Sequence, residues 1–294
     1  MKSTLLVLLG VVAAAFVLFW IQALRASART ERVRPTPYEL LVGFITDFFD
    51  TLGIGSFATT TSLYRWRATI DDRLLPGTLN VGHTLPTFVQ ALLYIKAVDV
   101  EARTLVAMIV AAVAGALLGA PVVARWPRSF VQLGMGAALL VLTAVLVYRQ
   151  VWTEPVSGTL GLTGNLFALG IAGNFVLGAL MTIGVGLYAP CLVLVSLLGM
   201  NPQAGFPIMM GSCAFLMPLA SVPFIRRGSY SPCAALGLML GGLPAVLLAA
   251  LVVKSLPLYW VKWLVAVVIV YTAVTLLRAA ARERTAGSVE ISGS

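Results

Sequence analysis

The octapeptide TLGIGSFA at residues 51–58 is echoed by TIGVGLYA at residues 182–189. The two stretches align without a gap at an offset of 131 residues, from position 51 to position 182. Each places a Gly-x-Gly sequence inside a long apolar segment, where glycine disfavours a continuous helix and permits a turn. Further apolar segments follow each copy. The pair therefore predicts two similar halves, each starting with a broken helix.

Composition indicates what kind of protein contains these halves. Of the 294 residues, 60% are hydrophobic and 11% are charged, whereas about 25% are charged in a soluble domain. Apolar runs of about 20 residues, each sufficient to cross a bilayer as a helix, recur along the chain. The sequence thus predicts an all-α polytopic membrane protein. The apolar segments are 3–24, 38–63, 77–95, 104–124, 129–149, 165–199, 205–225, 233–253 and 258–278.

Two of these segments are unusual, and they define the predicted domain organisation. Segment 38–63 is broken at its Gly-x-Gly sequence, and segment 165–199 is too long for one crossing. Interrupted segments at corresponding positions of two halves indicate a transporter whose repeats form the binding site. We expect two inverted repeats, each a re-entrant helix followed by three transmembrane helices. The predicted units are an extra helix and basic loop at 1–37, repeats at 38–150 and 165–278, a linker at 151–164 and a tail at 279–294.

The first apolar segment has two readings. Residues 3–24 are followed by Ala26-Ser27-Ala28, which resembles a signal-peptidase site. The apolar stretch is longer than a signal core, and Arg25 follows it directly. We therefore expect a retained transmembrane helix.

The distribution of basic residues predicts the topology. If the N-terminus is outside and both broken segments are re-entrant, 14 of the 20 basic residues lie inside. If the broken segments cross fully, the split is 12 to 8, which fits the positive-inside rule less well. We expect a multi-pass protein of the cell inner membrane with a cytoplasmic C-terminus. The inside residues are Arg25, Arg29, Arg32, Arg34, Arg65, Arg67, Arg73, Arg125, Arg128, Arg226, Arg227, Arg278, Arg282 and Arg284.

The broken helices are the first candidate site. A helix that begins after the first break would present free N–H groups and a positive dipole end, which favour an anion. Hydroxyl groups follow the break, and the second break offers a tyrosine at the matching place. The alternative is that Gly-x-Gly only allows close helix packing. The predicted substrate-binding residues here are Gly53, Gly55, Ser56, Thr59, Thr60, Gly184, Gly186 and Tyr188.

Asp47 and Asp50 are the acids deepest in an apolar segment. Their spacing places both on one face of a helix, and a buried carboxylate must be paired, solvated or protonated. We expect them to bind a coupling proton, with Na⁺ as an alternative ion. The other reading is structural, as a helix cap or an ion pair with Arg65 or Arg67. The matching positions of the second half are Gly178 and Met181, so a proton role would be asymmetric.

His83 is the sole histidine, and it lies within an apolar segment. Its ordinary pKa near 6.5 suits proton exchange or, when charged, contact with an anion. A lone histidine in a helix is also often only a hydrogen-bonded packing residue. Thr84 and Ser212 are expected to line the same site.

Other classes of function have little support. No nucleophile–base motif, no metal-ligand spacing and no phosphate-binding Gly-Lys-Ser loop is present, so we expect neither an enzyme nor a metal or other cofactor. The formal charge of +9 is better explained by basic loops at a membrane than by nucleic acid. The expected partners are a small anion, protons or Na⁺, the bilayer and, as an open alternative, further copies of the chain.

Four stretches resemble a known family. GFITDFFDTLGIGS (43–56) and GALMTIGVGLYAP (178–190) are similar to the twin signature of the sulfite exporter family TauE/SafE, also called the 4-toluenesulfonate uptake permease family. LPGTLNVGHTLPT (75–87) and NPQAGFPIMMGSCAFLMP (201–218) resemble its next element. The resemblance implies a secondary transporter of sulfur oxyanions or organosulfonates, such as sulfite, thiosulfate or sulfonates. A passive anion channel, a sensor or assembly subunit and a Na⁺-coupled transporter of another small organic anion remain as alternatives.

Overall fold

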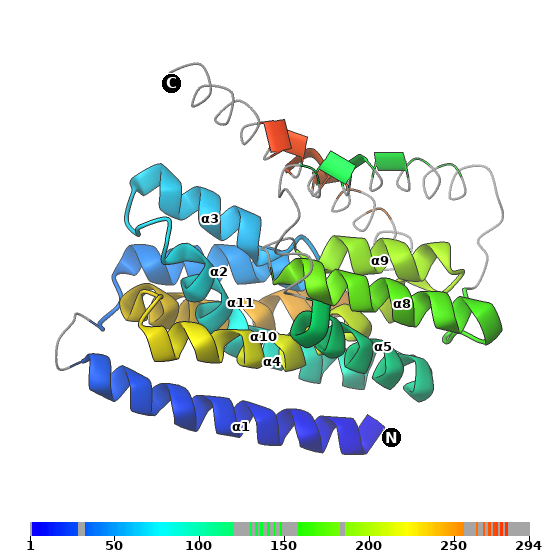
Figure 1. Cartoon of the computed structure of the whole chain (residues 1–294), viewed down its shortest axis with the longest axis horizontal. Coiled ribbons are helices and arrows are strands. Elements are labelled where there is room, and N and C mark those ends of the chain that lie inside the picture. Colours follow the sequence, from blue (N-terminus) through cyan, green and yellow to red (C-terminus); the bar gives the residue numbers. More distant parts are fainter. Residues whose placement is uncertain are drawn as a thin grey trace.

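The computed structural model describes residues 2–28, 33–119, 158–182 and 186–255, with single positions within 130–148 and 263–281. Every named element in these ranges is a helix (Figure 1). The predicted segments 129–149 and 258–278, residues 151–157 of the linker and the tail beyond 281 lie largely or wholly outside the described residues. Five described stretches are long and apolar enough to cross a membrane: Lys2–Ser27, Ala102–Gly119, Gly164–Met181, Pro202–Arg227 and Pro232–Val252. The all-α membrane class is thus confirmed.

The first broken segment begins with helix α2 (Pro37–Thr51). Thr36 and Glu39 form a capping box at its start, with Pro37 in the first turn. The helix stops at a turn in which Gly53 and Gly55 have φ angles of 98° and 84°. This left-handed region is open to glycine and costly for residues with a Cβ atom. The Gly-x-Gly sequence therefore makes the chain turn, as predicted.

Helix α3 (Ser56–Arg67) then returns antiparallel to α2. The Tyr38 hydroxyl, in the first turn of α2, donates to the Leu63 carbonyl near the end of α3 at 2.6 Å. The guanidinium of Arg67 also lies 4.4 Å from the centre of the Tyr38 ring. With 15 residues, α2 is about 22 Å long, shorter than a hydrocarbon core of about 30 Å. Segment 38–63 is therefore a hairpin that enters and leaves at the same end of the bundle.

The second broken segment forms the corresponding hairpin. Helix α8 (Gly164–Met181) is followed by α9 (Tyr188–Leu197), and the intervening residues 183–185, including Gly184, lie outside the described residues. A Cβ atom on Gly173 would meet the Leu194 side chain at 2.7 Å, which places the two helices side by side. Figure 1 shows the α2–α3 and α8–α9 hairpins entering from opposite ends, with the end of α2 and the end of α8 both near the centre.

The remaining helices hold the two hairpins. Helix α4 (Leu75–Ala97) packs against α10 (Gly205–Arg227), which follows the short helix η2 (Pro202–Ala204). Helix α2 packs on α11 (Pro232–Ser255), and α8 packs on α5 (Ala102–Ala114) and its π-helical extension η1 (Gly115–Gly119). Each hairpin therefore rests on a helix from the other half of the chain.

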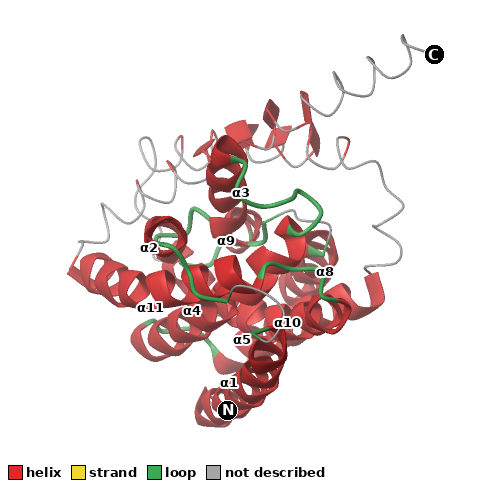
Figure 2. Cartoon of the chain, turned by 90° about the vertical axis from the view of Figure 1, so that its left-hand side faces the viewer, coloured by secondary structure: helices red, strands yellow, loops and turns green. Residues whose placement is uncertain are grey.

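Helix α1 (Lys2–Ser27) lies at the periphery of this bundle (Figure 2). It packs on α4 and α10, and the Lys2 ammonium reaches the Val98 carbonyl at 3.4 Å. Its first residue is therefore at the end of the bundle where α4 finishes. The buried residues of α1 are Leu5, Leu9, Phe16 and Trp20.

The two ends of the bundle differ in charge. The Ser231 N–H donates to the Thr78 hydroxyl at 2.9 Å at one end, and the Glu101 N–H donates to the Leu160 carbonyl at 2.7 Å at the other. The first we call the arginine-rich end. Among the described residues it has Arg25, Arg34, Arg65, Arg67, Arg73, Arg226 and Arg227, whereas the opposite end has Lys2, Lys96 and Arg103.

Glycine permits the contact between α2 and α11, which generates a stability prediction. A Cβ atom on Gly43 would lie 2.5 Å from the Leu238 carbonyl oxygen, so the helices must separate to accept a side chain. We expect Gly43→Val to lower the free energy of unfolding by about 1–3 kcal/mol, as for other overpacked sites. Gly10→Val on α1 is the control, since nothing lies within 4 Å of its Cβ position. Thermal unfolding in detergent measures both, and equal melting temperatures would contradict the described packing.

Candidate functional site

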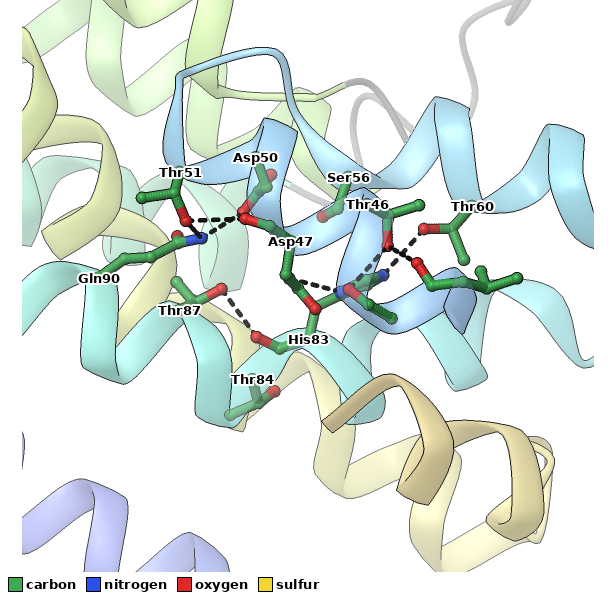
Figure 3. A network of polar contacts seen from close by, with 12 residues as sticks. Thr46, Asp47, Asp50, Thr51, Ser56, Thr60, His83, Thr84, Thr87 and Gln90 are labelled. Carbon is green, nitrogen blue, oxygen red and sulfur yellow. Dashed lines mark hydrogen bonds and ion pairs between the residues drawn. The ribbon is translucent and has the colours of Figure 1, made fainter. Parts of the chain in front are cut away.

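An aspartate–histidine pair lies at the centre of the bundle. Asp47 Oδ1 on α2 and His83 Nδ1 on α4 are 2.9 Å apart, and both side chains are fully buried. The other ring nitrogen, Nε2, is 3.1 Å from the Thr60 hydroxyl of α3 (Figure 3). The predicted residues Asp47, Thr60 and His83 are therefore brought together from three helices. Asp47 and His83 are called the Asp47–His83 pair below.

The second oxygen of Asp47 has no hydrogen-bond partner among the described residues. Gly242 of α11 lies against this Oδ2 atom, so closely that a Cβ atom at position 242 would overlap it. A buried carboxylate is costly in an apolar interior unless it is paired or protonated. The pair therefore has one oxygen held by the imidazole and another that is available to a proton. No group of three or more His, Cys, Asp or Glu residues in the described part of the chain is arranged to hold a metal ion.

Asp50 belongs to a second polar network that connects the two hairpins. Its Oδ2 atom accepts a hydrogen bond from Gln90 Nε2 at 2.9 Å, and the same amide nitrogen is 3.0 Å from the Thr51 hydroxyl. The amide oxygen of Gln90 accepts from the Tyr188 hydroxyl at 2.8 Å. Tyr188 is the first residue of α9, so the glutamine links the tip of the first hairpin to the second.

The first residue of α3 also faces Asp50. The backbone N–H and the hydroxyl of Ser56 lie close to the Asp50 carboxylate. A helix N-terminus favours negative charge, and here the chain supplies that charge itself. The place at which the sequence predicts a bound anion is thus next to an internal carboxylate.

Two of the predicted hydroxyl residues do not join these networks. The Thr59 hydroxyl donates to the backbone carbonyl of Ser56 at 2.8 Å, within its own helix. The Thr84 hydroxyl lies 3.4 Å from that of Ser221 on α10, on another face of α4 from His83. Neither side chain contacts Asp47 or His83, so the predicted site is smaller than the run of hydroxyl residues suggested.

The second half has a neutral contact between its hairpin and its crossing helix. Ser212 of α10 accepts from Asn174 Nδ2 of α8 at 3.1 Å, and the same amide donates to the Met108 carbonyl at 2.7 Å. Gly178, the counterpart of Asp47, lies against the backbone of Ala112 and leaves no space for a side chain. The predicted asymmetry of the acids thus has a packing reason. Gly186 lies two residues before the start of α9, with open space at its Cβ position.

The arginines near the hairpin have other partners. Arg65 pairs with Asp72 at 3.0 Å, and their side chains are 60% and 61% exposed. Arg67 stacks on the ring of Tyr38. The alternative reading of the two acids as partners of these arginines is therefore wrong. Asp47 pairs with histidine because α4 places His83 at the same depth in the bundle.

Gln90 is the functional candidate that the sequence analysis missed. It lies seven residues after His83, and two helical turns place both side chains on nearly the same face of α4. An amide in an otherwise apolar stretch at that spacing was a usable signal. Its partner Tyr188 is 98 residues away, however, and only the meeting of the hairpins reveals the contact.

Comparison of the chain with models of protein families, with curated proteins and with solved structures found no match.

The Asp47–His83 pair leads to a second prediction. His83→Leu leaves a buried carboxylate without its partner, which costs about 3–5 kcal/mol of unfolding free energy. The double variant Asp47→Leu/His83→Leu removes the charge as well, and we expect it to recover most of that loss. Unfolding by SDS titration in mixed micelles measures both variants. A double variant no more stable than His83→Leu alone would contradict the pairing.

Proposed function

We propose that the chain is a secondary transporter that moves a small anion across a membrane together with protons. The observation that carries this proposal is the Asp47–His83 pair, buried in apolar helices beside the turn of a re-entrant hairpin. Ionisable residues inside a membrane are costly, and they characteristically mark ion or proton pathways. The ordinary pKa of an imidazole, about 6.5, also suits proton exchange near neutral pH.

The arrangement of the hairpins supports transport rather than a static role. The two hairpins approach from opposite ends, and each packs on a helix of the other half. We interpret them as inverted repeats, whose meeting point is the usual place for a transporter's binding site. Rocking of one repeat against the other would expose this point to each side in turn.

The anionic nature of the substrate is supported by the donors around the turns. Ser56 provides a helix N-terminus and a hydroxyl, while Thr60 and Tyr188 provide further hydroxyls close to the acids. Gly53 and Gly55 allow the turn that exposes these groups. Protonation of Asp50 would remove its competing charge. The narrower class, a sulfur oxyanion or organosulfonate, rests on the family resemblance.

The proposed orientation follows from charge. The arginine-rich end would face the cytoplasm, in agreement with the positive-inside rule. Lys2 would then lie outside, and α1 would cross the membrane to reach Arg25. The proposed location is the inner membrane of a bacterial-type cell.

Flux through proteoliposomes tests the proposal. We expect wild-type protein to accumulate radiolabelled thiosulfate, sulfite or taurine when a pH gradient is imposed. Asp47→Asn should reduce this pH-driven uptake to the level of protein-free vesicles, because an amide cannot exchange the proton. Asp72→Asn is the matched control, as this exposed acid pairs with Arg65 on the surface.

Three results, two from this assay and one from electrical recording, would contradict the proposal. If uptake driven by the pH gradient is unchanged in Asp47→Asn, the Asp47–His83 pair is excluded as the proton site. Uptake that disappears when choline replaces Na⁺ would assign the coupling to sodium. Stepwise single-channel currents without accumulation would identify a passive channel.

A further inference from the structure

Gln90 occupies a position in which its amide is fully used. Its Nε2 atom donates to Asp50 Oδ2 at 2.9 Å and to the Thr51 hydroxyl at 3.0 Å, and its Oε1 atom accepts from Tyr188 at 2.8 Å. All four side chains are buried. The amide is therefore the connection between an ionisable group of one hairpin and a hydroxyl of the other.

The neighbours determine which way the amide faces. The Thr51 hydroxyl donates its hydrogen to the Asp47 carbonyl at 2.7 Å, so towards Gln90 it acts as an acceptor. Asp50 Oδ2 is also an acceptor, as an ionised carboxylate must be. The nitrogen of the amide consequently faces α2, and its oxygen is left for the Tyr188 hydroxyl.

We propose that Gln90 transmits the protonation of Asp50 to Tyr188, whose hydroxyl then donates a hydrogen bond to the transported anion. The anion part of this inference rests on the function proposed above. The relay part concerns only the side chains of this chain. It adds Gln90 as a positioning residue and gives Tyr188 a direct role in binding.

The relay follows from donor and acceptor chemistry. A proton on Asp50 Oδ2 turns that oxygen into a donor, which faces the donating Nε2 group of Gln90. A half-turn about the last torsion of Gln90, which has two nearly equivalent states, removes this conflict when the Thr51 hydroxyl also turns its hydrogen from the Asp47 carbonyl towards Gln90. Gln90 Oε1 then accepts from Asp50, and Nε2 donates to the Tyr188 oxygen. The phenolic hydrogen of Tyr188 is thereby released from the amide.

The released hydrogen couples the proton to the anion. Neutral Asp50 no longer supplies negative charge to the Ser56 N–H at the start of α3, while Tyr188 gains a free donor. Both changes favour an anion between the first residues of α3 and α9. The relay takes up one proton at Asp50 for each anion, separately from the proton exchanged by the Asp47–His83 pair, and Tyr188 keeps its own proton throughout. Without the anion, the ionised carboxylate restores the first arrangement.

The other titratable groups around Asp50 have partners of their own. Asp47 and His83 hold each other, and the Cys213 thiol of α10 contacts the Met181 sulfur at 3.5 Å. Among the described residues, Asp50 is thus the charged group that contacts the Gln90 amide. Protonation of Asp50 therefore starts the relay, and the Tyr188 hydroxyl is the group that it changes.

Infrared difference spectra of the purified protein, recorded between acidic and alkaline buffer without any anion, test the relay directly. We expect a carboxylic-acid band that Asp50→Asn removes, together with a shift of the tyrosine C–O band that Tyr188→Phe removes. Gln90→Met has nearly the same length and cannot relay, so it should keep the acid band and lose the tyrosine shift. If Gln90→Met fails to fold, the single variants Asp50→Asn and Tyr188→Phe still decide the question. They show whether the tyrosine shift depends on the carboxylic acid of Asp50.

Tyr94→Phe is the matched control for these spectra. Tyr94 is a buried tyrosine on α4 whose hydroxyl donates to the Thr51 carbonyl at 2.9 Å, outside the relay. It should therefore leave both bands unchanged. A tyrosine shift that persists in Gln90→Met or in Tyr188→Phe would overturn the relay.

Binding of thiosulfate tests the link to the anion. Since one proton accompanies each anion, wild-type affinity should fall by about tenfold per pH unit above the range in which Asp50 is protonated. Gln90→Met should flatten this dependence, and Tyr188→Phe should weaken binding at every pH. A wild-type protein that shows the coupled bands but binds and transports no anion would overturn the proposed function and leave the relay. If the wild-type protein transports thiosulfate and Gln90→Met leaves the pH dependence of binding unaltered, the relay would be overturned and the proposed function would stand.

Discussion

A helix that turns back inside an apolar bundle must find partners for its free backbone groups, because lipid offers none. The turn after α2 finds such partners both within its own residues and on another helix. The Gly53 N–H donates to the Asp50 carbonyl at 2.8 Å, and the Tyr94 hydroxyl donates to the Thr51 carbonyl at 2.9 Å. Once these partners are provided, the start of α3, the two acids and the imidazole are all brought to the same depth.

The two hairpins share a backbone plan and differ in chemistry. The first has a carboxylate and an imidazole between its hairpin and α4, whereas the second joins Asn174 to Ser212. Gly178 cannot become a second Asp47, since Ala112 of α5 occupies the space. The proposed coupling therefore resides in one half, and Tyr188 is the means by which the other half takes part in it.

Much of this arrangement could be predicted from residue patterns. Low charge and repeated apolar runs indicated a helical membrane protein, and the two Gly-x-Gly sequences located both breaks. The charge count favoured a re-entrant hairpin, which α2 and α3 form. Asp47, His83 and Thr60 were suspected separately. Gln90 escaped notice because an isolated amide in a helix has no motif around it.

The sequence by itself determined the class of the protein, the two breaks and the set of unusual polar residues, since these depend on local composition and on the backbone freedom of glycine. Only the tertiary structure decided which of those residues meet. Asp47 is 36 positions from His83, and Gln90 is 98 from Tyr188. Such contacts arise when hairpins pack against crossing helices, and no periodicity along the chain records that packing.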